Sequence, residues 1–286
     1  MTWRIINADC REAMADMDAE SVQSVVTDPP YELTSARPGG RGPATEGKVM
    51  RGFMGMAWDG SGVAFQTSTW EAALRVLKPG GHLLTFGGTR TYHRLTCAIE
   101  DAGFEIRDCL CWLYGTGFPK SKNLDGKWEG WGTGLKPAWE PIILARKPLG
   151  KPNVAANVLE HGTGALNIDG TRIGTEPRVN PPMGSPEKSY GGYGATATAT
   201  AGRWPTNVLL DEEAAARLDA QSGEGSRGTG NHGTGSGGIW NPPIGGPVGP
   251  TYADAGGASR FFYTSKASSA ERHGNMEYGG EVALRQ

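Results

Sequence analysis

The sequence predicts an α/β fold, in which a doubly wound, mostly parallel sheet is accompanied by a glycine-rich, irregular insertion. Over the first 115 residues, short aliphatic runs alternate with segments of helical apolar spacing. This alternation is typical of parallel strands joined by helices. Glycine supplies 45 of the 286 residues and proline 19, which indicates long irregular segments beside the sheet.

The N-terminal elements are read from short apolar runs and their stop signals. Residues 3–7 are expected to form a strand and residues 11–17 a helix, with Asp9 in the N-cap position. Residues 22–27 are β-rich and stop at Asp28-Pro29-Pro30. Two prolines cannot continue a central ladder, so this strand must end at Thr27.

The same alternation continues to residue 145. Residues 35–59 are rich in Gly, Arg and Pro and are expected to form a mobile loop. Helices are expected at residues 70–77, before the stop signal Lys78-Pro79-Gly80-Gly81, and at residues 92–102, before Gly103. Strands are expected at residues 82–86, 104–112 and 141–145.

Beyond Pro148 the composition changes. We expect a helix at residues 153–160, short strands at 165–168 and 204–210, and a strand-like run at 260–264. Residues 177–203 and 223–257 are rich in small and polar residues and are expected to be loops. The predicted organisation is a catalytic domain at 1–149, a target-recognition and loop-rich region at 150–257, and a segment at 258–286 that returns to the catalytic domain.

Composition narrows the class of protein. The chain has no apolar run of about eighteen residues, as a membrane span needs, and its N-terminus has no signal layout. We therefore expect a cytoplasmic protein without a membrane partner. The four cysteines are too scattered for a disulfide scaffold, and no metal site is expected from their spacing.

One stretch, residues 115–151, is locally basic although the net charge of the chain is −2. Seven basic and three acidic side chains give it an excess of +4, and three tryptophans lie among them. Basic and aromatic side chains together suit a phosphate backbone and unstacked bases. A solvated loop pinned to the core by its tryptophans explains the pattern equally well. The candidate DNA contacts are Lys120, Lys122, Lys136 and Trp139.

The tetrapeptide Asp28-Pro29-Pro30-Tyr31 is the candidate catalytic site, because ligands of doubly wound sheets bind at the carboxyl ends of strands. The exocyclic amine of a base is a poor nucleophile. The carboxylate of Asp28 and the carbonyl of Pro29 could accept its two N–H groups and favour a tetrahedral nitrogen. The Pro29-Pro30 pair would hold the second acceptor rigidly, and Tyr31 could stack on a flipped base. The alternative is a turn that merely closes the strand.

Several motifs together resemble the DNA amino-methyltransferases that depend on S-adenosylmethionine, in the circular order that places the catalytic half first. The similarity is greatest to members common in phages and prophages. The matching segments are Asn7-Ala8-Asp9-Cys10, Asp28-Pro29-Pro30-Tyr31, Leu77-Lys78-Pro79-Gly80-Gly81, Phe86-Gly87-Gly88-Thr89-Arg90-Thr91, Gly115-Thr116-Gly117-Phe118-Pro119-Lys120, Lys136-Pro137-Ala138-Trp139-Glu140-Pro141, Arg203-Trp204-Pro205-Thr206-Asn207-Val208 and Arg260-Phe261-Phe262-Tyr263-Thr264-Ser265-Lys266-Ala267.

The resemblance implies a Rossmann-like methyltransferase sheet and S-adenosylmethionine as cofactor. It implies that Asp9 and Cys10 lie near the adenosine of the donor and that Asp28 lies between donor and target base. A helix cap is the alternative role of Asp9, and a surface lysine is the alternative for Lys266, a candidate contact of the donor's methionine carboxylate. Phe86-Gly87-Gly88 is read as a strand-to-helix turn rather than a ligand contact. Asp at the first tetrapeptide position is more typical of members that methylate adenine N6 than of those that methylate cytosine N4.

The chain departs from the family after Lys266. Family members continue with an Asn-x-His-Pro-Thr-x-Lys-Pro-like segment and an Asp-Pro-Phe-x-Gly-Ser-Gly-like donor loop, and neither occurs here. The sheet is therefore expected to be incomplete, with an exposed edge that invites a partner. Three explanations remain open: a second polypeptide or homodimer that completes the donor site, a truncated and inactive chain, and a protein that binds double-stranded DNA without methylating it. Methylation of another amine, in RNA or protein, is a further alternative.

Overall fold

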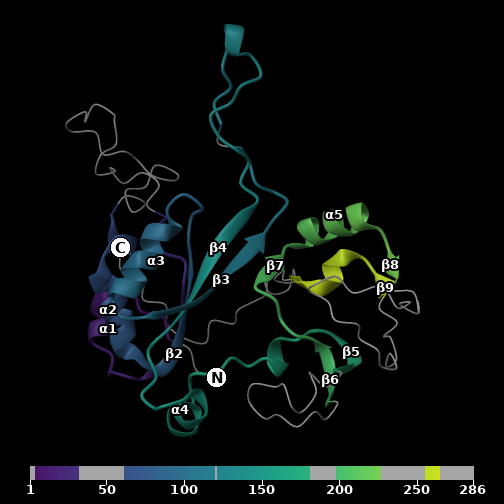
Figure 1. The fold of residues 1–286 in the computed structure, drawn as a ribbon. Helices are drawn as coiled ribbons and strands as arrows, with labels where there is room; N and C mark the ends of the chain where they lie inside the picture. Colours follow the sequence, from purple (N-terminus) through teal and green to yellow (C-terminus); the bar gives the residue numbers. More distant parts are fainter. Residues whose placement is uncertain (1–3, 32–60, 120, 181–197, 227–254, 265–286) are drawn as a thin grey trace, which may run out of the picture.

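The computed structural model describes residues 4–31, 61–119, 121–180, 198–226 and 255–264 (Figure 1). The predicted loop at residues 35–59 and the candidate residues Lys120 and Lys266 lie outside these ranges. None of the helices within them is long and apolar enough to cross a membrane.

The first elements confirm one predicted strand and correct another. Helix α1 spans Cys10–Ala15 and strand β1 spans Val22–Thr27, which ends at the residue before Asp28 as predicted. The strand expected at residues 3–7 is wrong for the described residues 4–7, which form no strand. Ile5 and Ile6 remain 66% and 47% exposed, so an apolar run had no neighbouring strand to pair with here.

Helix α2 (Thr67–Val76) follows the short 3-10 helix η3 (Val63–Phe65) and leads directly into strand β2 (Leu77–Phe86). The helix does stop where predicted, but Lys78-Pro79-Gly80-Gly81 belongs to β2. In the pairing of β1 with β2, Val22 lies opposite Leu77 and Ser24 opposite His82. The proline and glycines thus form an irregularity within the strand, which explains why the strand appeared to begin only at His82.

The main sheet has the order β1-β2-β4-β3-β7-β10. The remaining members are β3 (Glu105–Leu113), β4 (Trp139–Arg146), β7 (Val208–Leu210) and β10 (Tyr263–Thr264). β4 is antiparallel to both neighbours, and the other five strands share one direction. The predicted α/β class and mostly parallel sheet are confirmed. Within the described residues, β1 lies at one edge of the sheet.

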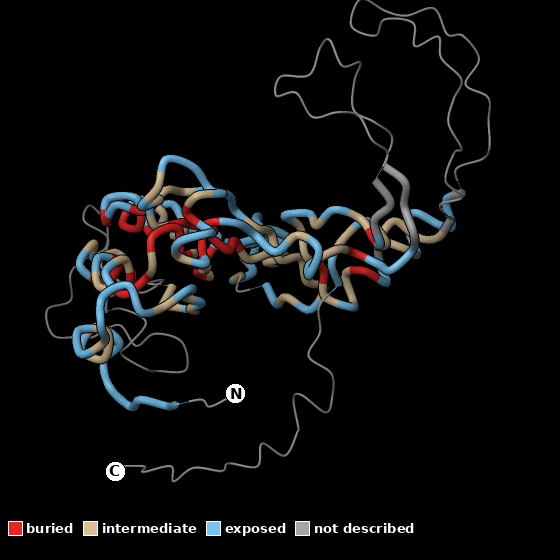
Figure 2. The backbone as a smooth tube through the Cα atoms, turned by 90° about the horizontal axis from the view of Figure 1, so that it is seen from below, coloured by how far each residue is buried: buried red, intermediate tan, exposed pale blue. Residues whose placement is uncertain are grey.

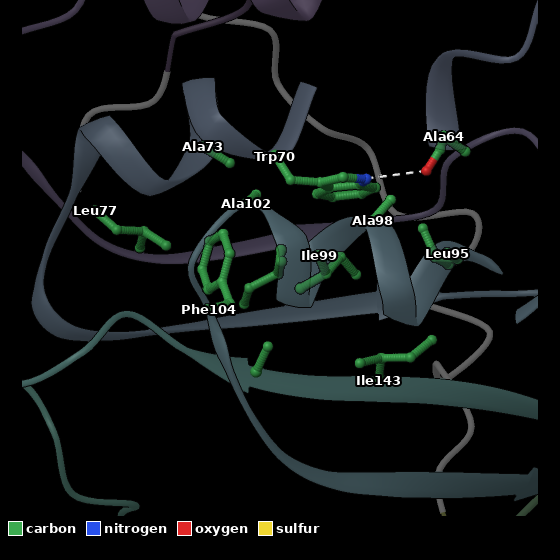
Figure 3. Packing of buried hydrophobic residues seen from close by; sticks show 12 residues of the cluster. Ala64, Trp70, Ala73, Leu77, Leu95, Ala98, Ile99, Ala102, Phe104 and Ile143 are labelled. Atoms are coloured by element: carbon green, nitrogen blue, oxygen red, sulfur yellow. Dashed lines mark hydrogen bonds between the residues drawn. The ribbon is translucent and has the colours of Figure 1, made fainter. Parts of the chain in front are cut away.

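The hydrophobic core lies between the sheet and helices α2 and α3 (Tyr92–Asp101) (Figure 3). Leu83, Ile99 and Ile143 are at most 1% exposed. The indole N–H of Trp70 donates to the carbonyl of Ala64 over 2.9 Å, so the one polar atom of this large side chain is satisfied. This packing fixes β2 and β4, which carry the residues that face the tetrapeptide.

The region after Pro148 contains more regular structure than its composition predicts. Helix α4 (Val154–His161) is confirmed, with Asn153 as its N-cap. The strand expected at residues 165–168 is wrong, because these residues form no strand and lead into the 3-10 helix η5 (Asp169–Thr171). β5 (Ile173–Asn180) and β6 (Thr198–Arg203) pair as an antiparallel ribbon inside a segment that we expected to be loop. Backbone pairing between strands does not require apolar side chains. The low-complexity sequence therefore gave no sign of the β5–β6 ribbon.

The expected strand at 204–210 is confirmed only at its end, as β7, and helix α5 (Glu212–Ser222) was not predicted. The remaining pieces are β8 (Gly225–Ser226), β9 (Ala255–Gly256) and the 3-10 helix η6 (Ala258–Phe261), so the strand-like run at 260–264 is strand only in β10. Buried segments are concentrated in the α/β part of the chain, with few in this later region (Figure 2).

Candidate active site

The ends of four strands meet at one edge of the sheet. β1, β2 and β3 end there, and β4, which runs in the opposite direction, begins there. Asp28 follows β1, the Gly87-Gly88 turn follows β2, and Glu140 is the second residue of β4. Strand direction therefore brings the predicted tetrapeptide next to residues that lie about 60 and 110 positions later in the chain.

Hydrogen bonds hold Tyr31 both at its backbone and at the tip of its side chain. Its backbone carbonyl accepts a hydrogen bond from Thr91 Oγ1 over 2.8 Å. Its phenol donates to Glu140 Oε2 over 3.3 Å. A Cβ added to Gly88 would lie 3.2 Å from Tyr31 Cδ2, so this glycine lets the turn pack closely against the ring.

The Phe86-Gly87-Gly88 turn has the role that we favoured. The amide of Gly87 donates to the carbonyl of Pro141 over 3.0 Å, and the amide of Tyr92 donates to the carbonyl of Gly88 over 2.8 Å. The turn thus joins β2 to α3 and is tied to β4. Its close approach is to the Tyr31 side chain.

The pKa values of the groups around Tyr31 are displaced from their ordinary values. Partial burial raises the pKa of Glu140; the Tyr31 hydrogen bond opposes this, and the Asp28 carboxylate adds to it. Burial, Glu140 and Asp28 all raise the pKa of Tyr31. The phenol of Tyr31 consequently remains protonated at neutral pH and acts as a hydrogen-bond donor.

Glu140 was missed as a site residue, although it stands in a motif that carried the resemblance. In the sequence, a single carboxylate beside Trp139 at the start of an apolar run indicates only where the strand begins. Only the pairing of β4 between β2 and β3 brings it to Tyr31.

Aromatic side chains surround the same edge. Trp139, a predicted DNA contact, packs on Tyr92 with ring centroids 6.1 Å apart. Phe86 packs on Trp112 with centroids 5.8 Å apart. Trp112 lies opposite Glu140 in the β3–β4 pairing, and its buried indole N–H has no hydrogen-bond partner in the described part of the chain. At Trp139, the structure favours anchoring to the core, one of the two interpretations left open for this stretch.

Asp9 is the N-cap of α1. Its carboxylate accepts from the Arg11 amide over 2.8 Å, from Arg11 Nε over 3.1 Å and from Arg11 Nη2 over 2.8 Å. These bonds lower the pKa of Asp9 to about 2. The predicted cap is confirmed, whereas a contact of Asp9 or the adjacent, exposed Cys10 with the donor stays a prediction.

The side of Asp28 that faces away from β2 is open in the described structure. Val26, two residues before Asp28, is 68% exposed, and the outer edge of β1 pairs with no described strand. Aliphatic residues of a parallel sheet are usually covered on both faces. The described residues therefore enclose the Tyr31 side of the tetrapeptide and leave the opposite side uncovered.

Residues 114–138 form an arm that extends from the ends of β3 and β4 (Figure 1). Near its tip, the 3-10 helix η4 (Gly126–Trp128) places Trp128 against Trp131, with ring centroids 5.2 Å apart, and Lys127 over the Trp128 ring. Trp131 remains 61% exposed. Of the predicted DNA contacts, Lys122 is exposed, and Lys136 Nζ donates to the Gly115 carbonyl over 2.8 Å at the base of the arm.

The cysteines of this chain form no disulfide. All four are free thiols, and within the described ranges no three His, Cys, Asp or Glu side chains come together as a metal ion would require.

Comparison with known proteins identifies relatives. The sequence model of a family described as DNA methylase matches residues 22–232. The chain is also similar to the type II methyltransferase M.HindIII of Haemophilus influenzae, with 25% identity over 198 residues, which cover 57% of this chain and 64% of that protein. The matched part is thus somewhat less than two thirds of the relative's length.

Solved structures show weaker likeness. One is assigned as a DNA modification methylase of Thermus thermophilus and was solved with S-adenosyl-L-methionine; identity is 22%, coverage 51% of this chain and 54% of that chain, and the TM-score 0.33. Another is the cytosine-N4-specific PvuII DNA methyltransferase, with 16% identity, coverage of 52% and 50%, and a TM-score of 0.34. The chain spans about half the length of each.

The family match rests on sequence over most of the chain. It begins at the first residue of β1 and runs through the tetrapeptide, the β2 turn, the arm and β4. These are the segments whose ends meet around Tyr31. The chain belongs to the N6/N4 DNA methylase family.

Proposed function

We propose that this chain carries the catalytic half of a DNA methyltransferase, which transfers a methyl group from S-adenosylmethionine to the exocyclic amine of a flipped base in double-stranded DNA. The observation that carries the proposal is the position of Asp28-Pro29-Pro30-Tyr31 at the carboxyl end of β1, with Tyr31 held by Thr91 and Glu140. The chain's membership of the DNA methylase family supports it.

In the proposed reaction, the protein activates the amine by accepting its protons. The Asp28 carboxylate accepts one N–H and the Pro29 carbonyl accepts the other, which draws the nitrogen lone pair out of conjugation with the ring. S-adenosylmethionine, when bound, supplies an electrophilic methyl group. Asp28 can also take up the proton that the nitrogen loses after methylation, and pass it to water.

Tyr31 orients the base. A base that has left the duplex loses its stacking partners, and an aromatic ring replaces them at about 1–3 kcal/mol per base. Because the backbone of Tyr31 is anchored by Thr91 and its phenol by Glu140, the ring is held in place before the base arrives. Such preorganisation places the amine against Asp28 at little further entropic cost.

Adenine N6 is the proposed target atom. Asp at the first position of the tetrapeptide, as in Asp28, favours it through the family resemblance. Cytosine N4 is the alternative, because the family that matches this chain covers both N6 and N4 methylases.

The donor would be held by Asp9, Cys10, Asp28 and Lys266. The residues described here fit the target side of the reaction better than the donor side, because Asp9 and Cys10 are exposed and Val26, near the end of β1, is 68% exposed. Both oxygens of Asp9 already bind Arg11, so a donor hydroxyl would have to use their remaining lone pairs.

A second candidate function follows from that open side: a DNA-binding half that becomes active only with a partner. The unpaired edge of β1 favours it, because an edge strand with exposed aliphatic side chains is a template for another strand. The partner would be a second polypeptide or a second copy of this chain that completes the donor site.

DNA would lie along the arm. Lys122, Lys136 and the exposed Trp131 belong to the arm, which leaves the sheet at the edge where β1 also ends, and lysines near a phosphate backbone bind it without regard to sequence. We assign recognition of the target sequence to residues 150–257, and we expect the reaction to take place in the cytoplasm of a bacterial or phage-infected cell.

The experiment is methyl transfer to unmethylated duplex DNA with labelled S-adenosylmethionine, followed by mass spectrometry of the nucleosides. The chain is assayed alone and with the product of the neighbouring reading frame, and the Asp28→Ala variant is the control. Label on N6-methyladenine supports the main proposal. Label on N4-methylcytosine supports the same reaction with cytosine N4, rather than adenine N6, as the target atom. Label only with the added polypeptide supports the partner-dependent enzyme. DNA binding without label in any mixture overturns the catalytic proposal.

A further inference from the structure

We propose that Glu140 is a positioning residue of the active site, which fixes the direction of the Tyr31 side chain through its phenol. The role of Tyr31 toward a base rests on the proposed function. The contact between Glu140 and Tyr31 does not, and it can be tested separately.

The backbone of Glu140 is fixed by three strands. β4 lies between β2 and β3, with Glu140 opposite Trp112 and its neighbour Trp139 opposite Leu113. The next residue, Pro141, accepts a hydrogen bond from the Gly87 amide over 3.0 Å. A carboxylate on a strand with neighbours on both sides is held in one position more precisely than a carboxylate on a loop.

Tyr31 follows a strand that does not contact β4. β1 pairs with β2 only, and β2 separates it from β4 in the sheet. The hydrogen bond from the Tyr31 phenol to Glu140 therefore spans β2 and ties the catalytic tetrapeptide to the centre of the sheet. Together with the bond from Thr91 to the Tyr31 carbonyl, it anchors the residue at opposite ends. Two anchors fix the direction of the side chain, where a single backbone anchor would leave it free to change rotamer.

The choice of a carboxylate matters for strength. A hydrogen bond to an ionised acceptor is about twice as strong as one between neutral groups. Glu140 and Tyr31 are both partly buried, so water competes less for either group. Gly88 lies close to the ring as well, because a Cβ added to it would be 3.2 Å from Tyr31 Cδ2.

The titratable groups around Glu140 come from two places in the chain. Asp28 and Tyr31 lie in the turn after β1, and Tyr114 follows β3. Burial and the Asp28 charge raise the pKa of Glu140, and the Tyr31 hydrogen bond lowers it. Protonation of Glu140 weakens its hold on Tyr31, because a neutral carboxyl group is a weaker acceptor than a carboxylate.

The sign of the coupling gives a test that needs no activity. Side-chain carboxyl carbons of ¹³C-labelled glutamate are titrated by NMR in the whole chain, and the Glu140 resonance is identified by its loss in Glu140→Gln. Tyr31→Phe removes a hydrogen bond to the charged form, so the pKa of Glu140 should rise. Asp28→Asn removes a nearby negative charge, so it should fall. Glu129, in the arm, should titrate identically in all variants. An unchanged Glu140 in Tyr31→Phe overturns the proposal.

Activity then tests the positioning role. Glu140→Gln keeps a neutral acceptor for the phenol, as protonated Glu140 does in the wild type, but cannot ionise; its kcat should lie between those of the wild type and Glu140→Ala, and it should lose the part of the acid limb of the pH profile that Glu140 causes. Glu140→Ala and Tyr31→Phe should each lower kcat about 10-fold, the size expected for one hydrogen bond to a charged group. The double variant should lose no more than either single one, because both remove the same contact. The role would be refuted if the fold-losses of kcat in the two single variants multiplied in the double variant. A wild-type pH profile in Glu140→Gln would refute it as well.

The two tests separate this inference from the proposed function. Shifts of the Glu140 pKa with the expected signs, in a chain that methylates no DNA, would uphold the contact and reject the reaction. Methylation with no response of Glu140 to Tyr31→Phe would uphold the reaction and reject the inference. If Glu140→Ala fails to fold, Glu140→Gln and Tyr31→Phe still decide the question.

Discussion

The described residues pack around Asp28 on one side and leave its other side exposed. Toward β2 and β4, Tyr31 is bonded to Thr91 and Glu140 and packed on Gly88. On the other side, Val26 is 68% exposed and the outer edge of β1 has no described partner. The side assigned to the target base is thus preorganised, and the side assigned to the donor is not.

Sheet order explains the difference. Loops at the ends of β2, β3 and β4 crowd around the tetrapeptide because these strands lie next to one another on one side of β1. Among the described residues, no strand lies on the other side of β1. Substitutions at Tyr31 and its contacts should therefore affect chemistry and stability much more than substitutions of the exposed residues Val26 and Asp9.

The largest effect is expected for Asp28→Ala. The loss of a placed acceptor in the transition state costs about 100- to 1,000-fold in kcat. The melting temperature should hold, because Asp28 is exposed at the end of β1. Asp18→Ala, also exposed, is the matched control. Methyl transfer is measured beside thermal unfolding, and a variant that still methylates would remove Asp28 from the mechanism.

Packing should contribute much more to stability in the core than at the exposed Val26 of β1. Ile143→Ala should lower the free energy of unfolding by about 2–5 kcal/mol, because Ile143 is 1% exposed in the core. Val26→Ala should change it by less than about 0.5 kcal/mol, because Val26 is 68% exposed. Denaturant titration measures both. A large cost at Val26 would indicate that a second copy or a bound partner covers the edge of β1.

Gly88→Ala should disturb the Tyr31 side selectively. The added Cβ would lie 3.2 Å from both Tyr31 Cδ2 and Thr91 Oγ1, so the ring must shift by a few tenths of an ångström. Because small misplacements of a positioning group are costly, kcat should fall by roughly 3- to 10-fold with little change in stability. Gly225→Ala, where the added Cβ has room, is the control. Unchanged kcat would show that the position of Tyr31 is not critical.

The arm should show a smaller, salt-dependent effect. Lys122→Ala should reduce the slope of log K against log salt for duplex DNA by about 0.9, the value for one released counterion. Lys151 is paired with Glu160 over 2.5 Å, and Lys151→Ala should leave the slope unchanged. Fluorescence anisotropy at several salt concentrations compares them. Equal slopes for wild type and Lys122→Ala would remove this lysine from the DNA contact.

The smallest effect is expected at Asp9. Because folding lowers the pKa of its carboxyl from 3.8 to about 2, the charge stabilises the fold above pH 4, and this contribution is lost as the pH falls toward 2. Asp9→Asn should therefore melt slightly below the wild type at pH 6, and the two should converge near pH 2. A gap that persists at pH 2 would assign the effect to something other than the charge.

The sequence by itself determined the end of β1 at Thr27, the cap at Asp9 and most helices before residue 162, and it predicts the chemistry of Asp28 and its neighbours. These features are local, because a proline pair, a capping carboxylate or a period of 3.6 residues acts within a few positions. Local signals also misled: residues 4–7 and 165–168 have the composition of strands but no strand beside them.

Only the tertiary structure decided which residues face Tyr31. Thr91 and Glu140 lie 60 and 109 positions away from it, and no local pattern relates them to the tetrapeptide. The antiparallel direction of β4 reverses the usual geometry, so the start of that strand, rather than its end, reaches the site. Pairing between distant strands is decided by the packing of the whole sheet, which is why the chemistry of Asp28 could be predicted from its neighbours in the chain while the residue that orients Tyr31 could not.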